Sequence, residues 1–122
     1  MMRNLIFVYT LIVNNLVLFS QNYNILNYGA IPDGKTLNTS AIQSAVDAAH
    51  HYGGGKVIIP AGNFLSGSIL LKSNVELNLL KDAVLLGSIN PDHYIKLNRW
   101  KALIIADNEN NISITGEGTI DG

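Results

Sequence analysis

Val57-Ile58-Ile59-Pro60 is the stretch that decides the fold, because similar apolar runs follow it at nearly constant steps. Residues 84–87 (Val-Leu-Leu-Gly) begin 27 residues later, and residues 112–115 (Ile-Ser-Ile-Thr) begin 28 residues after that. A second series has the same step, from residues 75–79 (Val-Glu-Leu-Asn-Leu) to residues 102–106 (Ala-Leu-Ile-Ile-Ala), 27 positions further on. Short β-rich runs at a fixed period are typical of a solenoid. We therefore expect the first residues of the three runs to lie one above another: Val57, Val84 and Ile112.

Polar corners separate these apolar runs. Runs of three to five residues between such corners suit the rungs of a single-stranded parallel β-helix, where strands of successive rungs stack about 4.8 Å apart. The longest departure from the pattern, residues 87–99, is expected to leave the coil as a loop. Several asparagines fall at corners, where their amides could stack as ladders along the coil. They are Asn74, Asn78, Asn108, Asn110 and Asn111.

A helix is expected before the first rung, over residues 39–52. Ser40 and Gln43 have the spacing of a capping box, with Asn38 and Thr39 as competing caps, and Gly53 ends the pattern. A solenoid needs its open end covered, so this helix is predicted to cap the coil. Its apolar positions form one stripe: Ala41, Ile42, Ala45, Val46 and Ala49.

Composition excludes several classes of protein. The chain has 122 residues, enough for at most one domain, and its 48% hydrophobic and 14% charged content is that of a folded protein. With no Cys, it forms no disulfide, thiol catalyst or cysteine metal site. Net charge is −1, and no basic stripe offers itself to nucleic acid. We expect no nucleic-acid partner and no cofactor.

The N-terminus has the pattern of a secretory signal peptide over residues 1–20. Arg3 precedes a largely apolar stretch, residues 5–19, which polar residues follow. This stretch is short and is interrupted by Asn14-Asn15, so it suits a cleaved signal better than a membrane span. We expect cleavage after Ser20, with a secreted or periplasmic product that no longer contacts the membrane. A frayed apolar N-terminus on a cytosolic protein is the alternative.

Five blocks of sequence, in order, resemble the family 28 glycoside hydrolases, the polygalacturonases and their relatives. The first four blocks fall in residues 28–34, 41–48, 53–62 and 67–77. The last consists of residues 83–88 together with residues 111–122, which read Asn-Ile-x-Ile-x-Gly-x-Gly-Thr-Ile-Asp-Gly. The resemblance covers residues 23–122. It implies a right-handed parallel β-helix and a secreted enzyme that hydrolyses galacturonic-acid-type linkages of pectic polysaccharide with inversion, as a monomer. Residues 21–122 would be the N-terminal part of its glycosidase domain.

The family's catalytic motifs do not occur in this sequence. Its members use a paired-Asp motif, a Gly-His-Gly motif and a later basic Arg-x-Lys segment. Residues 99–101 (Arg-Trp-Lys) have the last spacing but precede the 118–122 block, whereas the family's basic site follows it, so the role is not carried over. We assign no catalytic, cofactor-binding or metal-binding residue, and expect the catalytic rungs to follow Gly122. This segment alone is predicted to be inactive.

Other candidates are better explained structurally. Asp107 and Glu109 could share a face as a carboxylate pair, but their Asn-rich surroundings favour a solvated turn, and Asp121 is expected to be a turn residue. Adjacent histidines 50 and 51 cannot chelate one ion from one helix face, and His93 is isolated. The glycines at 53–55 end a helix and begin no phosphate loop. Trp100 and Tyr94 could stack on a sugar, although packing of the loop is the expectation for Trp100.

Two other functions stay open at this stage. A pectate lyase of the same architecture would cleave by β-elimination, usually with calcium. A non-enzymatic β-helical protein could bind carbohydrate or serve a structural role. The block at residues 118–122 favours the hydrolase.

Overall fold

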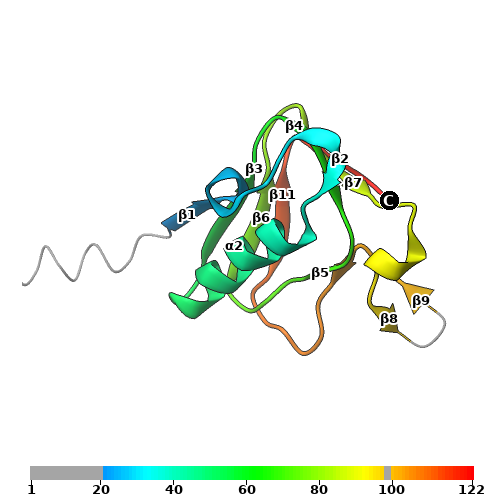
Figure 1. Ribbon diagram of the computed structural model, residues 1–122. Coiled ribbons are helices and arrows are strands. Elements are labelled where there is room, and N and C mark those ends of the chain that lie inside the picture. Colours follow the sequence, from blue (N-terminus) through cyan, green and yellow to red (C-terminus); the bar gives the residue numbers. More distant parts are fainter. Residues whose placement is uncertain (1–20, 98–99) are drawn as a thin grey trace, which may run out of the picture.

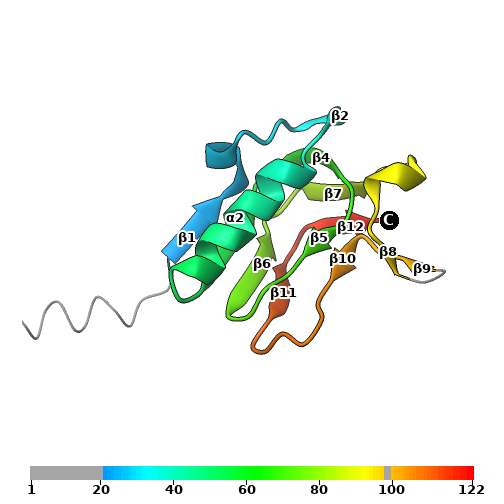
Figure 2. The same ribbon diagram turned by 60° about the horizontal axis from the view of Figure 1, so that its bottom comes forward.

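The computed structural model describes residues 21–97 and 100–122, with no side-chain description at Trp100. Its strands coil into a right-handed parallel β-helix with a single α-helix, α2 (Thr39–His51), lying across one end (Figure 1). Three parallel sheets run along the coil, and Figure 2 shows them side by side. The predicted fold class is confirmed.

Each sheet takes at most one strand from each turn of the coil. The first sheet has the order β1 (Gln21–Asn24), β3 (Gly55–Ile59), β6 (Val75–Leu79) and β11 (Ser113–Gly116). The second has the order β2 (Asp33–Leu37), β4 (Gly62–Ser66), β7 (Ala83–Gly87) and β12 (Thr119–Asp121). The third pairs β5 (Ile69–Leu70) with β10 (Ile104–Ile105). Short 3-10 turns follow β1 and β7: η1 (Ile25–Tyr28) and η2 (Pro91–His93).

The predicted register was wrong, although the fold was right. Val57 stacks on Leu77, 20 residues later, and Leu77 stacks on Ile114. Val84 lies in the second sheet, beside Asn63 and Thr119. The 27-residue step therefore combines one 20-residue turn of the coil with the offset between two sheets of the same turn. All strands of a buried coil have similar apolar composition, so sequence spacing alone did not separate them.

The second predicted series has the same error. Residues 75–79 form β6 in the first sheet, whereas residues 104–105 form β10 in the third. Ile104 stacks on Ile69, 35 residues earlier, because the intervening turn carries the long excursion from the coil. The predicted departure at residues 87–99 is confirmed over its described part: the chain leaves after β7 and forms η2 and an antiparallel hairpin, β8 (Lys96–Leu97) with β9 (Trp100–Lys101).

The interior of the coil is filled by alternate residues of each strand. Val57 and Ile59 of β3 and Leu77 and Leu79 of β6 all point inward and are buried. Phe64, Leu85 and Ile69 from the other sheets meet them in the same core. The helix closes this core with its predicted stripe, whose fully buried members are Ile42, Ala45, Val46 and Ala49.

One face of α2 also forms hydrogen bonds with the exposed edge of β5, the first strand of the third sheet. The Gln43 amide accepts a hydrogen bond from Leu70 N (2.8 Å) and donates one to Leu70 O (2.9 Å), as a neighbouring strand would. Thr39 Oγ1 accepts from Gly67 N at 2.7 Å. One turn beyond Gln43, Asp47 forms an ion pair of 2.7 Å with Lys72. The helix thus stands in for a strand that no earlier turn supplies.

The predicted capping box was therefore wrong. Gln43 faces β5 and not the helix N-terminus, because the strand edge offers it both a donor and an acceptor. Asn38 is the N-cap by position, but its side chain makes no capping bond. Its buried amide instead accepts from Ile31 N and donates to Ile31 O and Thr36 O, which fixes the loop before the helix. Gly53 does end the helix, in the left-handed region at φ 93°.

The asparagine ladder is confirmed at one corner of the coil. Asn74 and Asn111 both have left-handed backbones, and Asn111 Nδ2 donates to Asn74 Oδ1 at 3.1 Å. Beside them, a Glu109 carboxylate oxygen accepts from Ser73 N (2.7 Å) and Ser73 Oγ (2.5 Å). Asn78 lies on a strand and donates to Thr115 instead. The corner thus ties two turns of the coil together through side chains.

We predict that Gln43→Ala destabilises the fold by about 1–2 kcal/mol, because the variant removes both hydrogen bonds to the Leu70 backbone at an edge that water reaches. Urea unfolding followed by circular dichroism measures the change. Ser44→Ala, at an exposed position of the same helix, should change stability by less than about 0.5 kcal/mol. Equal effects of the two substitutions would contradict the strand-like role of Gln43.

A second prediction concerns the turn before α2. Asp33 accepts hydrogen bonds from Thr36 N, Lys35 N and Thr36 Oγ1, and these lower its pKa from 3.8 to about 2. A folded-state pKa below the unfolded one contributes stability that is present above about pH 4 and is lost as pH falls towards 2. NMR titration of the Asp33 carboxyl carbon should show this low midpoint, and Asp33→Asn should remove the corresponding pH dependence. A midpoint at or above 3.8 would refute the turn geometry.

Candidate functional site

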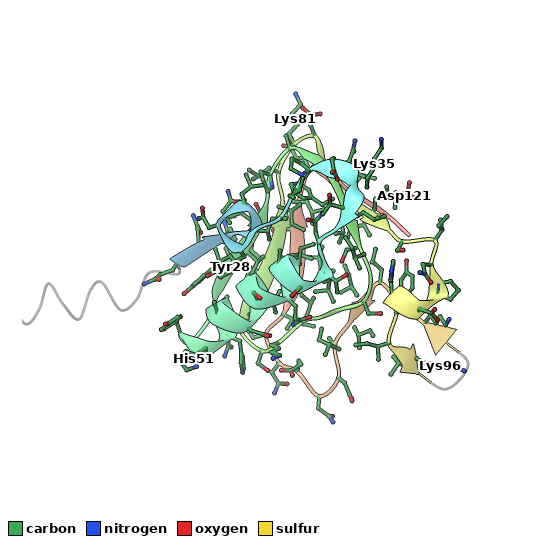
Figure 3. The ribbon with its side chains drawn as sticks, viewed as in Figure 1. Tyr28, Lys35, His51, Lys81, Lys96 and Asp121 are labelled. Carbon is green, nitrogen blue, oxygen red and sulfur yellow. The ribbon has the colours of Figure 1, made fainter. Side chains whose placement is uncertain are left out.

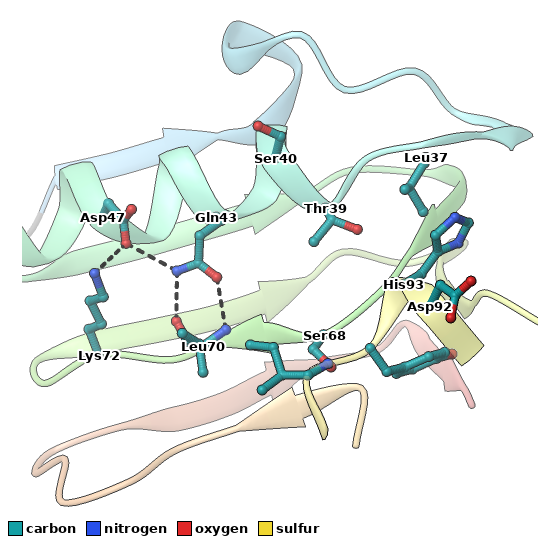
Figure 4. A pocket seen from close by; sticks show the side chains of 12 residues that line it. Leu37, Thr39, Ser40, Gln43, Asp47, Ser68, Leu70, Lys72, Asp92 and His93 are labelled. Atoms are coloured by element: carbon teal, nitrogen blue, oxygen red, sulfur yellow. Dashed lines mark hydrogen bonds and ion pairs between the residues drawn. The ribbon is translucent and has the colours of Figure 1, made fainter. Parts of the chain in front are cut away.

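An open groove of about 610 Å³ lies beside the capping helix. It lies between the first half of α2, β5 and the start of the excursion that follows β7 (Figure 4). Its lining combines an apolar floor with charged groups at both ends, and we call it the cap groove. The lining residues are Leu37, Thr39, Ser40, Gln43, Asp47, Ser68, Leu70, Lys72, Asp92, His93, Tyr94 and Ile95.

The helix end of the cap groove holds an ion pair. Asp47 binds Lys72 at 2.7 Å and accepts from the Gln43 amide at 3.0 Å (Figure 4). Partial burial alone would raise the pKa of Asp47, but the bonds from Lys72 and Gln43 outweigh it and lower that pKa below its usual value. Asp47 is therefore ionised and occupied, so it is unsuited to donate a proton as a general acid. Within residues 21–97 and 100–122, Lys72 Nζ binds Asp47 alone, which leaves two of its three N–H donors for a ligand.

The opposite end is built by η2 and the residues around it. Ser88 Oγ lies 2.6 Å from His93 Nδ1, and Tyr94 Oη donates to Ser88 O at 2.7 Å. Ser68 N donates to His93 O at 3.2 Å, and Ile95 N donates to Ser68 Oγ at 2.8 Å, which fastens the excursion to the coil. The Asp92 carboxylate projects at the rim and is exposed.

The close approach at Gly67 explains why the chain has glycine there. A Cβ at this position would lie 1.9 Å from the His93 carbonyl oxygen, so any side chain would push the excursion off the coil. The groove wall therefore depends on one small residue between β4 and β5. Gly67 belongs to one of the blocks that resemble the family, but the sequence alone indicated no such role for it.

Ser88 and His93 do not form a nucleophile and base. Asn90 Nδ2 lies 3.4 Å from His93 Nε2, and its N–H can only donate, so the Nε2 lone pair accepts. The ring proton is then on Nδ1, where it is donated to Ser88 Oγ. Asn90 N donates to the same oxygen at 3.1 Å, and Ser88 is buried. The pair orders the loop, because a base would need its free lone pair towards the hydroxyl.

The predicted site candidates are scattered by the structure. Glu109 bonds Ser73 at a corner, which supports the turn interpretation over a carboxylate pair with Asp107. Asp121 is not a turn residue but part of β12, beside Leu86. His50 Nδ1 lies 2.9 Å from Ser73 O at the same corner. Among residues 21–97 and 100–122, no group of three or more His, Asp or Glu side chains is placed to hold a metal.

Two further candidates concern the excursion. Arg99 lies outside the described residues, and the Trp100 side chain is likewise not described, so their predicted roles stay predictions. Tyr94 is half-buried and its hydroxyl donates to Ser88 O, so its ring is the part that faces the groove.

The signal peptide predicted over residues 1–20 also lies outside the described residues. Within the described parts, no helix is long and apolar enough to span a bilayer.

The described lining of the cap groove presents no pair of free carboxyl groups for inverting hydrolysis. Hydrolysis with inversion needs one free carboxylic acid and one carboxylate beside a water, roughly 6.5–9.5 Å apart. Of the two carboxyl groups that line the groove, Asp47 is held by Lys72, and only Asp92 is free. Neither Lys72 nor Gln43 was expected from sequence to line a site, since lone Lys and Gln residues carry no motif.

Comparisons with known proteins agree with this architecture. A family model described as "Rhamnogalacturonase A/epimerase, pectate lyase-like" matches residues 22–117. The exo-poly-alpha-D-galacturonosidase of Dickeya chrysanthemi is 45% identical, over 81% of this chain and 19% of that protein. The family 28 exopolygalacturonase of Yersinia enterocolitica superposes with a TM-score of 0.75 at 44% identity, over 85% of this chain and 21% of that chain.

A further solved structure has the same coil. The hyperthermoactive exopolygalacturonase of Thermotoga maritima superposes with a TM-score of 0.76 at 33% identity, over 84% of this chain and 25% of that chain. The chain thus spans about a fifth to a quarter of the length of these relatives. Since the family model covers most of the described residues, the chain belongs to the rhamnogalacturonase A/epimerase, pectate lyase-like family.

Proposed function

We propose that this chain forms the capped end and first turns of a glycoside hydrolase that cleaves galacturonic-acid-type linkages in pectic polysaccharide. The observation that carries the proposal is the 45% identity to an exo-poly-alpha-D-galacturonosidase across 81% of the chain. A likeness of TM-score 0.75 to a family 28 exopolygalacturonase supports it, with the same cap and coil. The enzyme would work as a monomer and without a cofactor.

In this proposal, residues 21–122 supply the scaffold and part of a binding surface. The catalytic acid and base would come from later turns of the coil, beyond Gly122. The cap groove is consistent with that division, because Gln43, Asp47 and Lys72 already bond one another or the backbone, and of its two carboxylates Asp92 alone has no ion-pair partner among the described residues. In an inverting hydrolase one carboxylic acid protonates the leaving oxygen while the other carboxylate activates a water.

The same proposal places the protein outside the cytoplasm. At the N-terminus a positively charged residue comes first, a largely apolar stretch follows, and polar residues come last. This order supports export through a cleaved signal peptide. Export to the periplasm or the medium would bring the enzyme to a polysaccharide that is too large to enter a cell. N-terminal sequencing of the exported protein should then begin near Gln21.

We predict that the product of the complete gene releases reducing ends from polygalacturonate without a rise in absorbance at 235 nm. Hydrolysis adds water across the linkage, whereas β-elimination leaves an unsaturated product that absorbs there. The 122-residue chain alone should release nothing above the buffer control. A rise at 235 nm would favour the lyase alternative, and activity of the isolated chain would refute the assignment of catalysis to later turns.

A further inference from the structure

Positive charge is concentrated in one short stretch of the excursion. Three of the eight Lys and Arg residues of the chain fall within residues 96–101, and no Asp or Glu occurs from 93 to 106. The net charge of the whole chain is −1. Residues 96–101 carry +3, so all other residues together carry −4 (−1 − 3 = −4). An anionic ligand would therefore be attracted to this stretch in preference to the rest of the molecule.

The hairpin places two of these charges directly opposite each other. Lys96 of β8 and Lys101 of β9 are cross-strand partners, so their Cβ atoms lie about 5 Å apart on one face. Both are exposed. Like charges in this position destabilise a two-stranded ribbon. An anion between the two ammonium groups would remove that cost.

No acidic side chain of the described residues forms an ion pair with Lys96 or Lys101. The ion pairs of the described residues join Lys56 to Glu76 and Lys72 to Asp47, and the residues outside the description include no Asp or Glu. Lys101 Nζ donates to Pro91 O at 3.3 Å, which holds the hairpin against η2 without neutralising it. The hairpin projects away from the coil, with Lys96 at its side (Figure 3).

The hairpin is continuous with the cap groove. Tyr94 and Ile95 line the groove, and the next residue along the chain is Lys96. A sugar chain held at Lys96 and Lys101 would therefore pass the Tyr94 ring, and sugar rings have apolar faces that pack on aromatic rings. At the far end of the groove it would meet Lys72, which keeps two free N–H donors.

We propose that the β8–β9 hairpin is a binding site for the carboxylates of a polyuronide, with Lys96 and Lys101 as the contacting pair. A polyuronide has one carboxylate on each sugar, so neighbouring sugars can engage neighbouring lysines. The choice of this polyanion rests on the proposed function. The sequence assigns these two lysines no catalytic role, so the site acts in holding the substrate.

The test is the affinity of the 122-residue chain for an unesterified α-1,4-linked galacturonic acid octamer, measured by NMR titration at an ionic strength of about 0.15 M, where the Debye length is about 8 Å. Lys96→Gln/Lys101→Gln should weaken binding at least tenfold. The matched control is Lys35→Gln/Lys81→Gln, which removes the same charge from exposed lysines that lie towards the top of the view in Figure 3, away from Lys96. It should change affinity by less than about twofold, because exposed charges beyond a Debye length are screened. Circular dichroism verifies that all variants are folded.

Three results would overturn the proposal. One is an equal loss of affinity in both double variants, which would show a response to net charge only. Another is binding of the fully methyl-esterified octamer as tight as that of the acid form, since the ester carries no charge. The third is tighter binding of a single-stranded DNA octamer, which would assign the hairpin to nucleic acid. Absence of octamer binding by the unaltered chain counts against the proposal equally.

The outcome is separable from that of the proposed function. The octamer could bind through the two lysines while the complete gene product hydrolyses nothing. In that case the hairpin would still be a uronide-binding site, but the protein would not be a hydrolase. If the complete gene product hydrolyses polygalacturonate and Lys96→Gln/Lys101→Gln leaves its KM unchanged, the proposed function stands and the proposed hairpin site is wrong.

Discussion

The third sheet of the coil has no strand before β5, and the structure depends on how the free edge of β5 is satisfied. Backbone N–H and C=O groups left without partners cost free energy, and an open edge invites pairing with other chains. In this protein the edge of β5 is covered by a helix. The Gln43 amide reproduces both hydrogen bonds of a neighbouring peptide to Leu70, and Thr39 accepts from Gly67. Helical spacing of four residues brings these side chains to one face, while the apolar stripe closes the core.

The same helix sets one wall of the cap groove, so stability and binding share the same residues. Asp47 and Gln43 are fixed by the strand edge and by Lys72, and this leaves the groove with a lysine end and an apolar floor. The excursion supplies the other wall and is held to the coil through Ser68 and the close contact at Gly67. A cap that only covered the core would need no such polar face.

The sequence predicted the fold class, the helix and the excursion, because each depends on local composition. It did not predict the register. Val57, Val84 and Ile112 are equivalent in composition, but only stacking in three dimensions decides that Val57 pairs with Leu77.

Side-chain partners that are distant in sequence were missed for the same reason: Gln43 matched a capping box, and its actual partner, Leu70, is 27 residues away. The Asn74–Asn111 contact was foreseen because asparagines recur at corners. The cap groove was not, since it arises from residues with no motif.

Amide hydrogen exchange tests most directly whether the helix takes the place of a strand. Leu71 N donates to Ile105 O at 2.8 Å within the third sheet and serves as the internal reference. Gly67 and Leu70, whose N–H groups point towards the helix, should exchange about as slowly as Leu71. Exchange of Gly67 and Leu70 at the rate of an unfolded chain, with Leu71 still protected, would show that the edge is open and contradict the account.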